Sequence, residues 1–331
     1  MIFKKKPILF FEFLERRIRY IAVDSQSHSI IEKEEILFDT EIVYEGKIMN
    51  PSLVVNRLKA LVAEKKWKNS RTSILLPDDF VIIREEKVPS QLTPSEIRDY
   101  IRLHMNHLIR TPFKQTNFHF EVLEKEATEQ TILLMLYSNE VIMQYESLLE
   151  DAGLKPVVAD ISSLSLYRII EKQQEIGLDE EKHVLVLQWS PVNNCMSVFH
   201  QGMPKFIRHS RSARLTDLWN VTKEGEWKWK GSEESLHETI SDMLDILERF
   251  LEFYRYSVMD GKEGVTDIFL SGDFPNIKNL QHQLSKRFYL PIHELGISEE
   301  VGAAFLPLYG LSLKEKKNVV QALKKGKGEK D

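Results

Sequence analysis

The chain has 331 residues, of which 42% are hydrophobic and 29% are charged, a composition typical of a folded globular protein and not of a disordered one. This length exceeds that of one ordinary domain and favours two lobes of similar size. The formal net charge of −5 lacks the basic excess with which proteins neutralise nucleic-acid phosphates, so nucleic acid is not expected as a partner.

The N-terminus and the cysteine content bear on where the chain works. An apolar run begins at Pro7, but Glu12 interrupts it well short of the length of a secretory signal. No apolar stretch approaches the roughly 20 residues that span a bilayer. Cys195 has no second cysteine with which to form a disulfide, which suits a reducing compartment. These features predict a cytoplasmic protein without a membrane span of its own.

The first quarter of the chain reads as a sheet followed by a helix. Runs rich in β-branched and aromatic residues predict strands over 8–14, 17–23 and 29–38. Asn50 and Pro51 then have the residue types of a helix N-cap and first helical position, and the apolar spacing that follows predicts a helix packed on this sheet.

The next segment reads as a small module inserted into the first lobe. Thr93-Pro94-Ser95-Glu96 predicts a capping box at the start of a helix over 94–109, which Thr111-Pro112 ends. The face of this helix that packs on the module is expected to carry Ile97, Ile101, His104 and Leu108. Paired strands over 118–123 and 131–137 follow, and then a helix over 139–152 with Gly153 after its end. The sequence therefore predicts a β-α-β-β-α module.

The second half of the chain repeats the opening plan. Strands are expected over 183–188, 194–200 and 205–210, after a polar link over 177–182. A helix over 233–258, a strand over 266–270 and a helix over 276–288 complete an α/β lobe, followed by a last helix. Two halves that begin with the same strand meander indicate an ancient duplication.

Several short motifs follow one another along nearly the whole chain. They are Leu75-Leu76-Pro77, Ile83-Arg84, Val88-Pro89, Glu96-Ile97, Thr111-Pro112-Phe113, the run 149–154, Ala159-Asp160-Ile161, the run 250–254 and Gly310-Leu311-Ser312-Leu313. In this order they resemble the PilM family, the actin-fold cytoplasmic members of the type IV pilus alignment subcomplex. The specificity of the resemblance lies in the order of the motifs.

The resemblance implies an α/β fold of two actin-like, ribonuclease-H-like lobes with an inserted subdomain. The first lobe is expected to comprise residues 1–73 and 155–180, joined by a C-terminal helix at about 300–325. The inserted β-α-β-β-α subdomain is expected over 74–154 and the second lobe over 181–299.

The same resemblance implies a partner. In that family a groove between the inserted subdomain and the first lobe receives the short cytoplasmic tail of the single-pass membrane protein PilN. Capture of an extended peptide suits such a groove, because backbone hydrogen bonds give affinity and a few side-chain pockets give specificity. Tyr100 and Arg110 are the candidate partner-binding residues, since a ring and a guanidinium near the edge of the helix can hold a peptide. Covering the rim of the core is the alternative role for both.

A scaffold of this kind is expected at the cytoplasmic face of the inner membrane. It would reach the membrane only peripherally, through its PilN-like partner, and would contact other pilus assembly proteins. A filament-forming protein remains a further alternative, which requires self-complementary lobe surfaces.

The resemblance also places a nucleotide cleft between the lobes. Actin-type clefts hold phosphates with loops after the first strand of each lobe, where a carboxylate helps to hold magnesium and glycines let backbone amides approach. In the first lobe the equivalent loop keeps a carboxylate at Glu12 but has Leu14 where the family has glycine. In the second lobe Gln188 replaces the acid, Ser190 replaces the glycine and Pro191 removes an amide donor.

The adenosine loop departs from the family as well. Where the family has a Gly-Gly turn, the chain has Ser271-Gly272-Asp273, which also reads as an ordinary turn from a strand to a helix. These departures predict a pseudo-ATPase with no catalytic residue, no metal and no cofactor. The alternative is an active protein that binds ATP and magnesium and couples the nucleotide state to partner binding.

Two other groups of residues each allow two interpretations. His104 and His107 lie one helical turn apart and supply half of a metal site, but the polar face of a helix is the expected interpretation. Trp219, Trp227 and Trp229 suit either an exposed contact surface or a packed hairpin of the second lobe.

Overall fold

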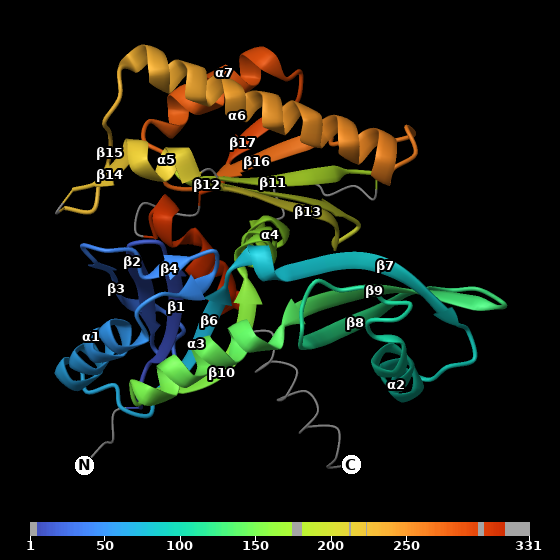
Figure 1. The fold of residues 1–331 in the computed structure, drawn as a ribbon, viewed down its shortest axis with the longest axis horizontal. Coiled ribbons are helices and arrows are strands. Elements are labelled where there is room, and N and C mark those ends of the chain that lie inside the picture. The colour runs from blue at the N-terminus through green and yellow to red at the C-terminus, as the bar shows by residue number, and fades with distance from the viewer. Residues whose placement is uncertain (1–4, 174–180, 212, 223, 297–300, 315–331) are drawn as a thin grey trace.

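The computed structural model describes residues 5–173, 181–211, 213–222, 224–296 and 301–314. Two lobes, each built on a five-stranded sheet, face one another, and a three-stranded unit lies beside them (Figure 1). Most of the expected link over 177–182, and the part of the expected C-terminal helix beyond residue 314, lie outside the described residues.

The sheet of the first lobe begins as an antiparallel meander and continues with parallel strands. Its strands are β1 (Ile8–Leu14), β2 (Arg17–Val23), β3 (Ile30–Leu37), β6 (Arg71–Leu76) and β10 (Lys155–Ile161), in the order β10-β6-β1-β2-β3. The short strands β4 (Val43–Tyr44) and β5 (Lys47–Ile48) pair separately. The three predicted opening strands are confirmed.

The sheet of the second lobe follows the same plan. Its strands are β11 (His183–Trp189), β12 (Asn193–His200), β13 (Met203–Arg211), β16 (Asp267–Ser271) and β17 (Ile292–Glu294), in the order β13-β12-β11-β16-β17. The pairing of the first two strands also corresponds between the lobes. Glu12 of β1 pairs with Arg19 of β2, and Gln188 of β11 pairs with Cys195 of β12. The first strand of each lobe therefore presents equivalent positions to the space between the lobes.

Two helices cover the outer face of the first sheet. They are α1 (Pro51–Glu64) and α3 (Asn139–Asp151). Asn50 caps α1 by accepting a hydrogen bond from the backbone N–H of Leu53, with Pro51 at the first helical position, as predicted. Buried side chains of both helices, among them Leu58 and Tyr145, pack with the strands in one core.

The second lobe is covered by a long helix and a shorter one. Helix α6 (Glu233–Phe253) continues into a π-helical turn, η2 (Tyr254–Val258), and α7 (Ile277–Arg287) lies beside it (Figure 1). A short helix, α5 (Ala213–Leu218), leads into the hairpin of β14 (Trp219–Val221) and β15 (Trp227–Trp229). Trp219 is buried in this lobe and packs edge-on against Trp229, so the tryptophans form a packed hairpin.

Two helices cross between the lobes. Helix α4 (Ser162–Gln173) packs on the inner face of the second sheet, and the helical segment 306–314, which follows the turn η3 (Ala303–Phe305), packs on the inner face of the first. At the crossing, a Cβ atom on Gly310 would lie 2.0 Å from the carbonyl oxygen of Ser165. Only glycine allows the two backbones to approach this closely.

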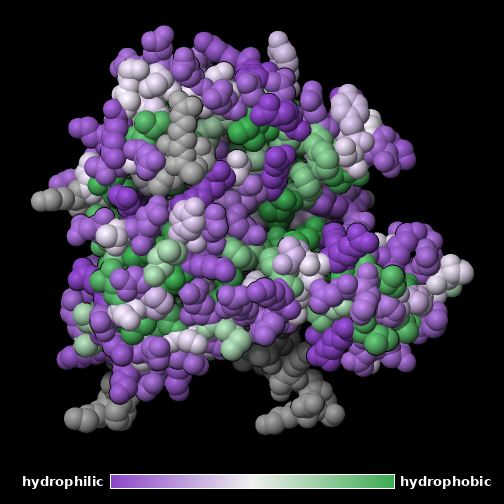
Figure 2. All heavy atoms as spheres, viewed as in Figure 1, coloured by the Kyte–Doolittle hydropathy of each residue, from purple (hydrophilic) through white to green (hydrophobic). Residues whose placement is uncertain are grey.

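The inserted unit has a core of its own. It contains β7 (Val81–Pro89), α2 (Pro94–His104), β8 (Thr116–Lys125) and β9 (Glu129–Ser138), and the turn η1 (Asp78–Phe80) leads into it. Helix α2 covers one face of the sheet β7-β9-β8 with Ile97 and Ile101. The predicted capping box at Thr93 is confirmed. In Figure 2 the surface is mostly hydrophilic, and apolar residues show where the second lobe faces this unit.

The end of α2 corrects a prediction. The helix stops at His104 and not at Ile109, because Met105 has an extended backbone and Asn106 is left-handed at φ 67°. Leu108 is 70% exposed and does not join the packed face. The apolar periodicity continues past the point where the backbone leaves the helix, so the prediction for Leu108 was wrong.

Helix α3 packs differently from the predicted grouping. The predicted β-α-β-β-α module includes this helix, but its buried side chains, such as Leu148 and Leu149, lie in the core of the first lobe with those of α1. The separate core of the inserted unit comprises β7, α2, β8 and β9. The loop after α3 has the expected form, since Gly153 is left-handed at φ 85°.

Candidate functional site in the cleft between the lobes

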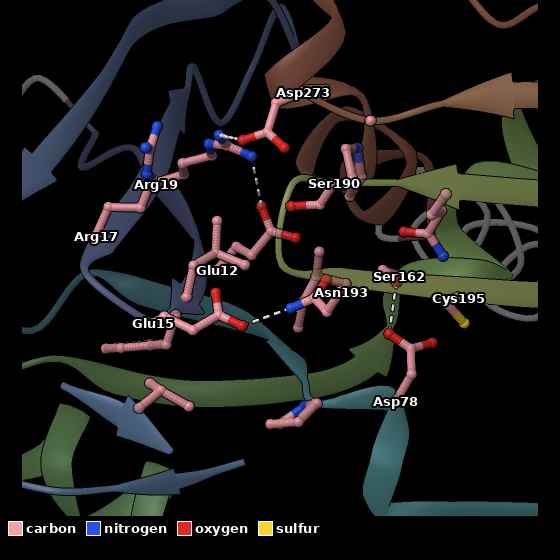
Figure 3. A pocket seen from close by; sticks show the side chains of 18 of the residues that line it. Glu12, Glu15, Arg17, Arg19, Asp78, Ser162, Ser190, Asn193, Cys195 and Asp273 are labelled. Carbon is pink, nitrogen blue, oxygen red and sulfur yellow. Dashed lines mark hydrogen bonds and ion pairs between the residues drawn. The ribbon is translucent and has the colours of Figure 1, made fainter. Parts of the chain in front are cut away.

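A cleft lies where the first strands of the two lobes face one another (Figure 3). Its free volume is about 140 Å³. All seven positions that the sequence indicated for the cleft line it: Glu12, Leu14, Gln188, Ser190, Ser271, Gly272 and Asp273. They come from the end of β1, from β11 and the residue after it, and from the end of β16 with the turn that follows.

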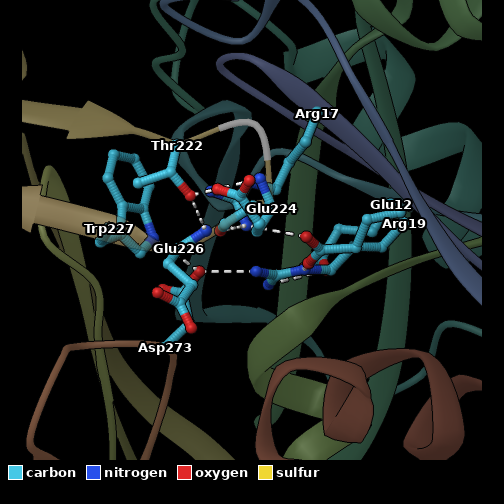
Figure 4. A network of polar contacts seen from close by, with 10 residues as sticks. Glu12, Arg17, Arg19, Thr222, Glu224, Glu226, Trp227 and Asp273 are labelled. Carbon is cyan, nitrogen blue, oxygen red and sulfur yellow. Dashed lines mark hydrogen bonds and ion pairs between the residues drawn. The ribbon is translucent and has the colours of Figure 1, made fainter.

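An ion-pair network crosses this cleft at Arg19. The buried guanidinium of Arg19 donates to Asp273 of the second lobe at 2.6 Å and to Glu35 of its own lobe at 2.5 Å (Figure 4). It also lies 3.9 Å from the carboxylate of Glu12. Burial acts to raise the pKa of Asp273, but the charges of Arg19 and Arg17, together with the hydrogen bonds from Arg19 and Trp227, outweigh burial and hold that pKa below its usual value. Asp273 is therefore a carboxylate paired with an arginine of the opposite lobe.

Arg17 extends the network to the tryptophan hairpin. Its guanidinium donates to Glu35 at 2.9 Å and to the carbonyl of Gly225 at 3.2 Å, and it lies 5.0 Å from the centre of the Trp227 ring. The indole N–H of Trp227 donates in turn to Asp273 at 3.0 Å (Figure 4). The hairpin is thus held to the first lobe by polar contacts as well as by ring packing.

Sequence reasoning missed both arginines. The usable signal was that Arg17 and Arg19 occupy alternate positions of a strand whose other side chains are apolar or aromatic. Alternate positions share one face of a strand, and a buried arginine requires anionic partners. The pattern indicates an ionic network on that face, although it does not identify Asp273 as a partner of these arginines.

Glu12 lies in the interior of the cleft. Burial raises the pKa of Glu12 to about 7, against the lowering effect of Arg19. One of its carboxylate oxygens, the amide nitrogen of Gln188 and the hydroxyl of Ser271 have no hydrogen-bond partner among the described residues. These groups give the cleft polar atoms that water or a small ligand can satisfy.

Asp78 fixes the start of α4 beside the cleft. Its carboxylate accepts hydrogen bonds from the hydroxyls of Ser162 at 2.5 Å and Ser163 at 3.0 Å, and burial raises its pKa (Figure 3). Another contact crosses between the lobes here, since the amide of Asn193 donates to Glu15 at 2.5 Å. The two lobes are therefore joined on both sides of Glu12.

Gly272 allows a close approach between the turn after β16 and the end of β11. Its backbone has φ 124°, and a Cβ atom there would lie 2.0 Å from the carbonyl oxygen of Trp189. Any other residue would displace one of these segments. In this structure the glycine of the predicted adenosine loop serves a contact between two segments of the second lobe.

In the loop after β11, the backbone amide of Ser190 is already hydrogen-bonded within the loop. The backbone N–H of Ser190 donates to the carbonyl of Asn193 at 3.0 Å, and Pro191 has no N–H. In the first lobe only Glu15 and Arg16 separate β1 from β2, because Leu14 pairs with Arg17. Neither turn is a glycine-rich loop of the kind that cradles phosphate groups.

A comparison with known protein families shows the family of this chain. A family model described as "Type IV pilus assembly protein PilM" matches residues 17–214. The chain belongs to the PilM family. No match is found among the curated proteins.

Solved structures agree with this assignment at the level of the fold. The chain is similar to a "PilM-PilN type IV pilus biogenesis complex" at a TM-score of 0.74 and 16% identity, over 93% of this chain and 98% of that one. It is also similar to the ethanolamine utilization protein EutJ from Carboxydothermus hydrogenoformans, at a TM-score of 0.53 and 8% identity, over 93% and 90%. The chain has the α/β actin-like fold.

The two residues proposed for partner binding lie in the inserted unit of this PilM-family chain. Tyr100 is half-buried on α2, and its ring stacks on that of His104 with centroids 4.0 Å apart. Arg110 is exposed and follows the end of the helix. The structure shows no contact between them. The His104 side chain also contacts the backbone of its own helix, because its Nδ1 lies 2.8 Å from the carbonyl oxygen of Tyr100.

None of the described helices combines the length and the apolar composition needed to cross a bilayer.

Proposed function

We propose that this chain is a scaffold of type IV pilus assembly that binds the cytoplasmic N-terminal tail of a PilN-like single-pass membrane protein. The family match over residues 17–214 carries the proposal. It is supported by the likeness to the chain of a PilM-PilN complex, which extends over 98% of that chain. The scaffold works at the cytoplasmic face of the inner membrane, is held there through its partner, and contacts other pilus assembly proteins.

The inserted unit is the proposed wall of the peptide groove. It adjoins the first lobe at the start of β7 and has a core of its own (Figure 1). Arg110 is exposed and Tyr100 is half-buried, which leaves both side chains open to a peptide. Extended-peptide binding requires few side-chain pockets, because backbone hydrogen bonds supply much of the affinity.

The cleft between the lobes is proposed not to hydrolyse ATP. Its free volume of about 140 Å³ is below the roughly 300 Å³ at which small-molecule pockets usually begin. The carboxylate of Asp273 is paired with Arg19, and the amide of Ser190 bonds within its own loop. The residues present therefore do not fit magnesium and ATP, and the ion pair between the lobes is a structural contact.

Calorimetry with magnesium and ATP tests this proposal for the cleft. The purified chain is expected to show no binding tighter than roughly 10 μM, which corresponds to about 7 kcal/mol. Tighter binding, or magnesium-dependent hydrolysis abolished in the Glu12→Ala variant, would establish the alternative of an active ATP-binding protein. One observation favours that alternative, namely the polar atoms of Glu12, Gln188 and Ser271 in the cleft that have no hydrogen-bond partner among the described residues.

A further inference from the structure

Two histidines and a glutamate meet at the end of the second lobe that lies away from the cleft. His183 begins β11 and His200 ends β12, and the two face each other in the antiparallel register. Their rings stack with centroids 4.0 Å apart and planes within 8° of parallel. Glu263 reaches them from the loop between η2 and β16, and one potential ligand atom from each residue lies within 4.8 Å of the others.

The second nitrogen of each ring is already held by another group. The Nδ1 atom of His183 lies 2.6 Å from the hydroxyl of Tyr254, and the Nδ1 atom of His200 lies 3.2 Å from the carbonyl oxygen of Lys182. A carbonyl only accepts, so the bond to Lys182 places the proton of His200 on Nδ1 and leaves a lone pair on Nε2. Histidines that bind metals usually have one nitrogen fixed in this way.

His183 can also carry its proton on Nδ1 and leave a lone pair on Nε2. Its Nε2 lies 2.8 Å from a carboxylate oxygen of Glu263, so without a metal this nitrogen carries a proton that it donates. The hydroxyl of Tyr254 can donate or accept, and the proton can therefore sit on Nδ1 instead.

We propose that His183, His200 and Glu263 form a binding site for a divalent transition metal of the zinc class. Two imidazole nitrogens and one carboxylate oxygen are three ligands that zinc accepts, and water completes a tetrahedral set. The rings must splay slightly from their stacked arrangement, because lone pairs on parallel rings do not converge on one ion. The bound ion would clip the loop before β16 to the ends of β11 and β12.

The burial of the three residues suits such a site. His183 is 1% exposed, whereas the side chain of Glu263 is 55% exposed and leaves a path for an ion from solvent.

Titration of Zn²⁺ into the full chain, first stripped with a chelator, tests the proposal. We expect one ion per chain with a Kd below about 10 μM, and a higher melting temperature with zinc. His200→Ala and Glu263→Ala should each weaken zinc binding by at least roughly tenfold, because each removes a ligand. The Tyr254→Phe variant should weaken it less, since Tyr254 only orients His183.

A matched control separates this site from nonspecific binding to histidine. His237 is exposed on α6, and His237→Ala should leave zinc affinity and stoichiometry unchanged. His183→Ala is not used, because its loss from a buried position would disturb folding. Absence of one-to-one zinc binding in the folded wild-type chain, or equal affinity in the wild type and His200→Ala, would overturn the proposal. None of these measurements depends on ATP or on a peptide partner.

Discussion

Arg19 and Asp273 lie 254 positions apart in the chain, and their side chains meet at 2.6 Å between the two lobes. Arg19 is also bonded to Glu35 and lies beside Glu12, so a single guanidinium is surrounded by three carboxylates. Both residues line the cleft between the lobes. Stability, closure of the lobes and ligand binding should therefore all depend on this pair.

Removal of one member of this pair should destabilise the protein. Asp273→Ala removes one of the three carboxylates around the buried guanidinium of Arg19. We expect the free energy of unfolding to fall by about 3 kcal/mol. Denaturant unfolding measures this change. The double variant Arg19→Met with Asp273→Ala should lose clearly less than the sum of the single losses, because the two side chains act as a unit.

An exposed ion pair supplies the control. Arg102 and Asp99 lie 3.4 Å apart on α2, with side chains 63% and 75% exposed. Asp99→Ala should change the free energy of unfolding by less than about 0.5 kcal/mol. If Asp273→Ala has an effect as small as this, the pair between the lobes does not hold the cleft closed.

Glu12 should make stability depend on pH in a defined window. Its pKa is about 7 in the folded chain, against 4.5 for an unperturbed glutamate. The folded state thus holds this proton more tightly, so its contribution to stability is fully present below pH 4.5 and is lost as the pH rises to about 7. Glu12→Gln should flatten this part of the stability profile and raise stability at pH 8 by up to about 3 kcal/mol.

Urea unfolding of the wild type and Glu12→Gln between pH 5 and 8 checks this prediction. Superimposable pH profiles for the two proteins would show that Glu12 ionises normally.

A single methyl group at Gly272 should be costly. Gly272→Ala forces a Cβ atom to within 2.0 Å of the carbonyl oxygen of Trp189 at a backbone angle of φ 124°. We expect a loss of at least about 3 kcal/mol, measured by thermal or denaturant unfolding. Gly296→Ala is the matched control, because no atom of the described residues lies within 4 Å of the added Cβ atom, and it should be close to neutral.

Local signals in the sequence predicted the starts of helices and the strand order of the meanders. Asn50-Pro51 and the capping box at Thr93 act within a few residues of themselves, so a single sequence contains all the information they require. The same applies to Gly153, which follows α3 in a left-handed conformation. The seven cleft positions could be placed together because the family resemblance supplied the lobe arrangement.

Features set by distant contacts could not be predicted in this way. The apolar spacing through Leu108 does not reveal that Asn106 turns left-handed and ends α2 early. The apolar face of α3 fits either core, and only the packing against α1 decides between them. The pairing of Arg19 with Asp273 depends on how two separately formed lobes close on each other.

The peptide groove should depend on Tyr100. Tyr100→Ala is expected to weaken binding of a PilN-like tail peptide by about 1 to 3 kcal/mol, the scale of a lost interface aromatic. The melting temperature should change little, because Tyr100 is half-buried at the edge of its core. Fluorescence anisotropy and thermal melting measure both properties in the same samples. A lowered melting temperature with unchanged affinity would make Tyr100 a core residue only.

His119 offers a control on the same unit. It is exposed on β8, and His119→Ala should alter neither the affinity for the peptide nor the melting temperature.

The central claim, a scaffold that binds its partner without using a nucleotide, is tested most directly by one titration. A labelled peptide with the cytoplasmic tail sequence of the PilN-like protein from the same organism is titrated with the purified chain in a chelator, without nucleotide. Saturable one-to-one binding is predicted, with the same affinity when magnesium and ATP replace the chelator. Binding that occurs only with magnesium and ATP would contradict the account.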